Sequence, residues 1–182
     1  MKCQTHHIQT VVLNIKRTNM RYRKSSKYFY FIVLIFLASS VFAQNIKKDT
    51  MEQLNFLIGE WVGTSKIYKN GIVTKQGSAY EKISYDLDKS ILVIELNTVF
   101  LQLRTIINYD EKDKKYYYHR FSKEGAARYP AEYKDGKLIV WKDEKTRFFF
   151  GRTIEGDFQE YGEQLINGKW TKIFEDTFKN TQ

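Results

Sequence analysis

Turn signals recur regularly along residues 59–182, and this spacing constrains the fold more than any other feature. Asn70-Gly71, Asp135-Gly136 and Asn167-Gly168 are the strongest of these signals, because both central residues of a type I′ turn need a positive φ. Further polar segments separate short runs that are rich in aromatic and β-branched residues. No window after residue 59 shows convincing 3.6-residue periodicity. The pattern therefore predicts a series of short antiparallel strands.

The runs between turns define where the strands lie. We place about ten of them near residues 59–68, 72–86, 90–97, 101–109, 114–121, 127–134, 137–142, 145–153, 158–166 and 169–179. Strands joined by tight turns form a meander, and closing that meander into a barrel removes its unpaired edges. The only proline, Pro130, is typical of an edge or a bulge. The sequence predicts an all-β, antiparallel up-and-down barrel.

A short helix is expected before the first strand. Thr50 is a candidate N-cap, and Leu54, Leu57 and Ile58 have the spacing of one apolar helix face. Gly59 would end this helix.

Residues 20–43 have the three parts of a secretory signal peptide. A basic stretch begins at Met20, an apolar run follows over residues 28–37, and Val41 and Ala43 occupy the −3 and −1 positions. The apolar run is about ten residues long, whereas a membrane-spanning helix needs roughly 20. We therefore expect export to the periplasm or outside the cell and no stable membrane insertion after cleavage. An uncleaved membrane anchor is the alternative.

The remaining boundaries follow from this assignment. Residues 1–19 have no place in a signal peptide, so they are either a mispredicted start, with Met20 as the initiator, or a disordered extension. Residues 44–182 form the mature part, which is long enough for one domain with a single core.

The basic character of the chain belongs mainly to its first 43 residues. Seven of the 30 Lys and Arg residues and none of the 21 Asp and Glu residues lie there, which leaves the mature part with a net charge of +2. Its charges alternate in sign instead of forming a basic stripe, so a nucleic-acid partner is not expected. Cys3 also lies in this segment, and the mature part therefore has neither a disulfide nor a lipid-bearing cysteine.

Phe56-Leu57-Ile58-Gly59-Glu60-Trp61-Val62-Gly63 resembles the F-L-x-G-x-W-x-G opening of a lipocalin-like superfamily. That group includes nitrobindin-type haem barrels and bacterial exported barrels. The resemblance covers roughly residues 51–180 and implies a barrel in which Trp61 plugs one end. Gly59, Trp61 and Gly63 are then structural residues, with Gly59 allowing the helix-to-strand turn.

Haem and metal ions are not expected. In nitrobindin-like proteins a histidine near the last strands binds the iron, but this chain has Tyr161, Trp170 and Phe174 in that region and no histidine after His119. The mature part has one histidine and no cysteine, so the usual nitrogen and sulfur ligands of zinc or copper are missing.

A ligand cavity is the main functional expectation. Barrels of this size can hold a small ligand, and strand faces that mix aromatic and cationic residues are candidate walls. The candidate ligand-binding residues are Arg104, Tyr117, Arg128, Trp141, Arg147 and Phe149. Arginines pointing inward among the aromatic residues would suit an apolar ligand with an acidic head. The more common alternative is that these arginines pair with acids on the surface.

Three functions follow for the domain. The leading one is non-enzymatic binding of a small, mostly apolar or amphipathic ligand. The second is an isomerase or hydrolase that uses an interior carboxylate or tyrosine; Glu160, Glu163 and Glu175 are candidates, although glutamates on strands are usually solvated. The third is a cell-surface interaction module. A buried carboxyl group with a raised pKa beside the cavity would favour the enzyme.

The signal-peptide interpretation predicts a mature protein that begins at Gln44. Cleavage after Ala43 follows from the small residues at positions 41 and 43. The intact mass of the exported protein measures this directly, with or without cyclisation of Gln44 to pyroglutamate. A mass that includes residues 28–43 would contradict cleavage and support the anchor.

Overall fold

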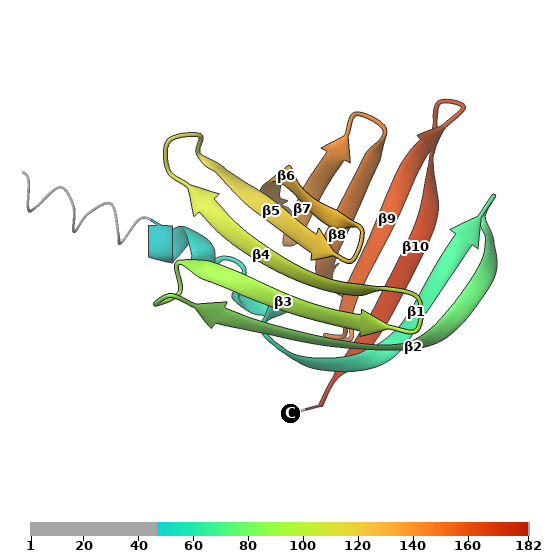
Figure 1. The fold of residues 1–182 in the computed structure, drawn as a ribbon, viewed down its shortest axis with the longest axis horizontal. Helices are drawn as coiled ribbons and strands as arrows, with labels where there is room; N and C mark the ends of the chain where they lie inside the picture. Colours follow the sequence, from blue (N-terminus) through green and yellow to red (C-terminus); the bar gives the residue numbers. More distant parts are fainter. Residues whose placement is uncertain (1–46, 182) are drawn as a thin grey trace, which may run out of the picture. The chain divides into compact units, whose positions relative to one another are not determined.

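Ten antiparallel strands form a closed barrel in a computed structural model that describes residues 47–181 (Figure 1). Each strand pairs with its neighbours in the chain, and β1 pairs with β10 to close the sheet. The up-and-down barrel predicted from the turn spacing is confirmed. The signal peptide at 20–43, the segment 1–19 and Gln44 lie outside the described residues. Within residues 47–181, no helix is long and apolar enough to span a membrane.

The strand bounds lie within two residues of those predicted. They are β1 (Gly59–Lys69), β2 (Ile72–Asp86), β3 (Ile91–Thr98), β4 (Gln102–Asp110), β5 (Lys115–Ser122), β6 (Gly125–Lys134), β7 (Lys137–Asp143), β8 (Thr146–Arg152), β9 (Phe158–Ile166) and β10 (Lys169–Asn180).

The hairpin turns account for this accuracy. Asn70 and Gly71, between β1 and β2, have φ values of 52° and 77°. The Asp135-Gly136 turn between β6 and β7 and the Asn167-Gly168 turn between β9 and β10 also have positive φ at both residues. This is the backbone that a type I′ turn requires, so the local sequence sets the register of these three hairpins.

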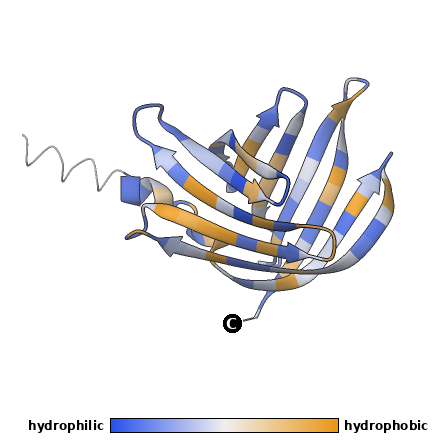
Figure 2. Ribbon diagram, viewed as in Figure 1, coloured by the Kyte–Doolittle hydropathy of each residue, from blue (hydrophilic) through white to orange (hydrophobic). Residues whose placement is uncertain are grey.

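Side chains alternate between the inside and the outside of the barrel. Along β3, Leu92, Ile94 and Leu96 are buried while the residues between them are more exposed. Hydrophobic and hydrophilic residues are mixed along most strands, whereas β3 begins with a continuous hydrophobic run (Figure 2). Pro130 lies on β6 next to Ala131, where the β6–β7 pairing of the described chain ends. This position agrees with the expected edge, because Pro130 cannot donate a backbone hydrogen bond.

The segment before β1 closes one end of the barrel. Residues 47–52 are α-helical and a 3₁₀ turn, η1 (Asn55–Leu57), follows. Met51, Leu54 and Leu57 are fully buried. The prediction of a short helix is confirmed, but the prediction that Thr50 is its N-cap is wrong, because the helix already includes residues 47–49.

Trp61 lies at this closed end and is fully buried. Its indole Nε1 donates a hydrogen bond to the Leu57 carbonyl oxygen at 3.0 Å, and its ring packs against Phe158 at 5.4 Å between centroids. The Arg152 guanidinium lies 4.3 Å from the Trp61 ring centroid and donates to the Phe56 carbonyl. A single side chain thus joins the helical segment to β8 and β9.

Two glycines permit this arrangement. Gly59 has a φ of 151°, and a Cβ there would lie 3.0 Å from the Trp61 ring. A Cβ on Gly63 would lie 1.8 Å from the Thr177 carbonyl oxygen on β10. Both positions therefore exclude larger residues for steric reasons, which gives the Gly-x-Trp-x-Gly motif a physical basis.

The burial of Trp61 predicts a large loss of stability in the variant Trp61→Ala. Truncating a buried aromatic side chain costs about 3–5 kcal/mol, a large share of the roughly 5–15 kcal/mol that stabilises a typical domain. Tyr68→Ala should cost much less, because Tyr68 is only half-buried and lies near the other end of β1. Chemical denaturation measures both variants, and equal small losses would show that Trp61 does not support the closed end.

Candidate functional site

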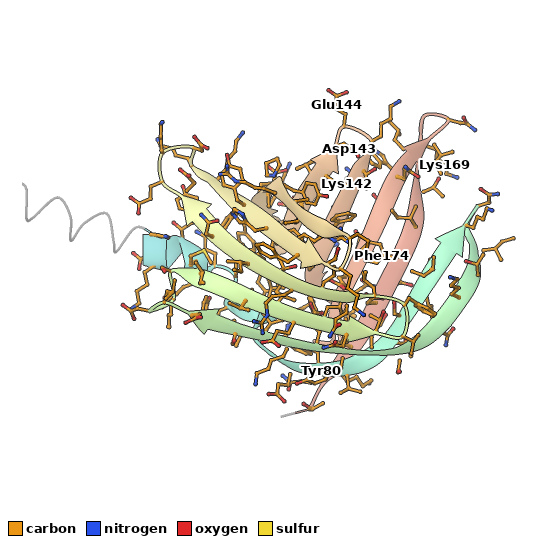
Figure 3. All side chains as sticks on the ribbon, viewed as in Figure 1. Tyr80, Lys142, Asp143, Glu144, Lys169 and Phe174 are labelled. Atoms are coloured by element: carbon orange, nitrogen blue, oxygen red, sulfur yellow. The ribbon has the colours of Figure 1, made fainter. Side chains whose placement is uncertain are left out.

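A cavity of about 280 Å³ occupies the part of the barrel away from Trp61. Most of its wall is aliphatic or aromatic, and several polar side chains, three of them carboxylic acids, lie among these residues. The lining residues are Ser65, Ile67, Glu81, Ile94, Leu96, Thr98, Phe100, Leu101, Leu103, Thr105, Tyr118, Arg120, Tyr129, Lys142, Thr146, Phe148, Phe150, Glu160, Ile173, Phe174 and Asp176. Figure 3 labels two of them, Lys142 by the β7–β8 turn and Phe174 on β10.

Three carboxyl groups lie in this cavity, and two of them form a row with a hydroxyl group. Ser65 on β1 is directly opposite Asp176 on β10, and Asp176 is directly opposite Glu160 on β9. Directly opposed residues on neighbouring strands have Cβ atoms about 4.5–5.5 Å apart. This register places the Asp176 carboxyl beside the Ser65 hydroxyl and the Glu160 carboxyl. Two carboxyl groups can share a hydrogen bond only when one of them carries a proton.

The third carboxyl group belongs to Glu81 on β2. Its side chain is 1% exposed, and neither carboxyl oxygen has a hydrogen-bond partner among the described residues. Asp176 Oδ1 and Thr105 Oγ1 are likewise buried without such a partner. Polar atoms buried in this way carry a free-energy cost, so these groups need an explanation beyond packing.

Burial and mutual repulsion determine how these acids are protonated. Burial raises the pKa of Glu81 well above the ordinary value of 4.5, and the nearby Asp176 raises it further. Burial also raises the pKa of Glu160, and the nearby Glu81 and Asp176 raise it further. The pKa of Asp176 is raised by burial, but the neighbouring Glu160 and Ser65 partly oppose that rise. Burial therefore favours the protonated form of Glu81 and Glu160 most strongly.

Tyr118 and Arg120 on β5 add further polar groups to the wall. Burial raises the pKa of the Tyr118 hydroxyl, and the neighbouring Glu160 and Glu81 raise it further. Tyr118 therefore stays protonated over the physiological range. Arg120 and Lys142 are the cationic residues of the lining. Both are less buried than the acids, and Lys142 is exposed.

The arginines proposed from the sequence lie on the outer face of the barrel. Arg104 pairs with Glu95 at 2.7 Å, and Arg147 pairs with Glu163 at 2.8 Å. The Arg128 guanidinium stacks 3.5 Å from the centroid of the Tyr117 ring. This is the surface arrangement that the sequence analysis gave as the more common alternative.

The aromatic candidates share this outer face. Tyr117 donates to Asp113 at 2.6 Å, and Arg147 packs over both Trp141 and Phe149. None of the six candidates lines the cavity. His119 is also outside the cavity lining, and its Nε2 lies 2.8 Å from Asn108 Oδ1.

Sequence reasoning named Glu160 among its candidate carboxylates but missed Glu81 and Asp176. It treated strand glutamates as usually solvated, which holds for neither Glu81 nor Glu160. A signal was nevertheless present: Glu81 alternates in phase with Ala79 and Ile83, and Glu160 with Phe158. An acid in phase with large apolar residues faces the core whenever those residues do.

Glu163 and Glu175, the other two acids considered for catalysis, face outward. Glu163 pairs with Arg147, and Glu175 accepts hydrogen bonds from Tyr68 and Gln159, each at 2.9 Å. Within residues 47–181, no group of three His, Cys, Asp or Glu side chains has an arrangement that could hold a metal ion.

Comparison with known proteins adds no family assignment. The chain matches no model of a known protein family, and no curated protein sequence matches it significantly. The fold and the cavity must therefore carry the functional argument.

The raised pKa of Glu81 predicts that this residue makes the protein less stable as the pH rises. The folded state binds the proton more tightly than the unfolded state, whose pKa is near 4.5. The stabilising effect of this proton is complete below that pH and is lost as the pH rises toward the folded pKa. Each pH unit of difference between the two pKa values corresponds to about 1.4 kcal/mol.

Urea unfolding of the wild-type protein and Glu81→Gln between pH 5 and pH 8 measures this effect. The variant should lose less stability over this range than the wild type. Glu95→Gln is the matched control, since Glu95 pairs with Arg104 on the outer face. Identical pH profiles for the wild type and Glu81→Gln would contradict a proton held by Glu81.

Proposed function

We propose that the mature domain is an exported lipocalin-like barrel that binds a small, mostly apolar molecule in its cavity. The observation that carries this proposal is the cavity of about 280 Å³ with a mainly apolar wall and a few convergent polar groups. Ligand sites in proteins combine these two properties. A barrel filled entirely by side chains would not support the proposal.

The two ends of the barrel differ in a way that gives the ligand a direction of entry. The helical segment and Trp61 fill one end. At the other end, Phe100 is exposed, Leu101 is half-buried, and Arg120 and Lys142 contribute charged groups. We place the entrance at this second end, between the β3–β4 and β7–β8 turns.

Membership of the lipocalin-like superfamily and export are parts of the same proposal. The first is supported by the closed ten-stranded barrel with a buried Trp61 in a Gly-x-Trp-x-Gly segment. Export is supported by the sequence of residues 20–43. A ligand-binding barrel that leaves the cytoplasm would act on molecules outside it.

The interior acids favour a second candidate function, acid–base catalysis. Glu160 and Asp176 lie directly opposite each other in a buried site, and their pKa values are raised. Carboxyl pairs with these properties recur in active sites as proton donors and acceptors. Hydrolysis of p-nitrophenyl esters or glycosides that disappears in Glu160→Gln would favour an enzyme of the hydrolase type.

Fluorescence of the neutral apolar dye N-phenyl-1-naphthylamine tests the binding function. The dye should bind to the wild-type protein, and Leu103→Trp should weaken its binding at least about tenfold, because the larger side chain occupies the cavity. Gln102→Trp is the control, since Gln102 is exposed on the same strand and does not line the cavity. Equal dye binding by both folded variants would show that the dye does not occupy the cavity.

A further inference from the structure

The deep part of the cavity holds several polar atoms that have no hydrogen-bond partner among the described residues. Both oxygens of Glu81, together with Asp176 Oδ1 and Thr105 Oγ1, are buried without partners in the described chain. The Glu81 side chain is 1% exposed and lines the cavity. Leaving such groups unpaired costs free energy, so a ligand group that donates several hydrogen bonds would satisfy them.

The charges around these atoms likewise favour a ligand group that donates hydrogen bonds. Among the described residues, no ion pair joins a Lys or Arg side chain to Glu81, Glu160 or Asp176 within 4.0 Å. The other titratable groups in the cavity wall are Tyr118, Tyr129, Arg120 and Lys142. Tyr118 carries no negative charge when protonated, and the two cations are less buried than the acids. The deep site is therefore acidic, and the positive charge lies in more solvated surroundings.

We propose that this acidic end of the cavity binds the ammonium group of an amphipathic amine, whose apolar part lies along the cavity wall. An ammonium group has three N–H donors and one positive charge, which suit the unpaired acceptors around Glu81 and Asp176. Hydrogen bonds between charged groups are the strong ones. A carboxylate in the same place would meet three acids, and an alcohol would offer a single donor.

Proton release is a consequence of this binding mode. Without an amine, burial and mutual repulsion favour protons on Glu81 and Glu160. An ammonium group favours the ionised form of these carboxyls, so its binding expels protons. The affinity for the amine should therefore rise with pH as long as the amine itself stays protonated.

This inference rests on the proposed ligand-binding function, and the experiment separates the two. Octylammonium, octanol and octanoate share one alkyl chain and differ in their head group. Each is titrated directly into the wild-type protein by calorimetry at pH 6 and pH 8, in two buffers with different ionisation enthalpies. These two buffers give the number of protons released.

We expect octylammonium to bind about 10–100-fold more tightly than octanol, because a hydrogen bond to a charged group contributes about 1.5–3 kcal/mol. Octanoate should bind more weakly than octylammonium. Octylammonium binding should release protons and strengthen from pH 6 to pH 8. Glu81→Gln should reduce the preference for octylammonium over octanol by at least about tenfold, whereas the outer-face control Glu95→Gln should retain it.

The other outcomes are distinguishable. If octanol binds the wild-type protein as tightly as octylammonium, or if octylammonium binding releases no protons, the ammonium site is refuted and the apolar binding function stands. If none of the three compounds binds, both proposals are refuted. Should Glu81→Gln fail to fold, the head-group preference and the proton count of the wild-type protein decide the question.

Discussion

The pairing of β1 with β10 is the interaction on which the rest of the structure depends. It runs from Trp61 opposite Asn180 to Ile67 opposite Phe174 and converts a ten-stranded meander into a barrel. Closure gives the sheet an inside, so each strand must commit one of its two faces to the interior. It also places Ser65 beside Asp176. The close approach at Gly63 shows how tightly the closing strands meet, because any side chain there would collide with β10.

One part of the barrel interior is filled by packed side chains, and the other part holds the cavity. Around Trp61, aromatic and aliphatic side chains fill the space, and the helical segment shields them from solvent. In the other part, side chains fill the space less completely and the cavity remains. One end can therefore supply much of the apolar burial that a domain without cysteine in residues 47–181 needs, while the other tolerates polar groups.

Buried carboxyl groups in such a barrel oppose folding unless something offsets their desolvation. Protonation is one way to reduce the cost, and the raised pKa values of Glu81 and Glu160 reflect it. The polar neighbours Ser65 and Glu160, directly opposite Asp176, are another. Neither gives the oxygens of Glu81 a hydrogen-bond partner among the described residues. Apolar residues at these positions would make a simpler core, so the acids point to a ligand or a reaction in the cavity.

Local sequence determined the strands, their turns and the way the chain meanders. Asn-Gly and Asp-Gly turns need no distant contact to favour a positive φ, and the resemblance of residues 56–63 to a lipocalin-like opening implied the roles of Gly59 and Trp61. The sequence did not determine which mixed face pointed inward. On β8, Phe148 and Phe150 face the cavity while Arg147 and Phe149 face outward, although both faces carry aromatic residues.

Barrel closure alone decided which face of each strand points inward, because it requires every strand to match the inner faces of both its neighbours. The same requirement brought together Glu81, Glu160 and Asp176 from β2, β9 and β10, which are far apart in the chain. Local patterns fix backbone conformation over a few residues. The surroundings of a side chain, and with them its pKa and its chemistry, depend on strands that only the tertiary structure makes neighbours.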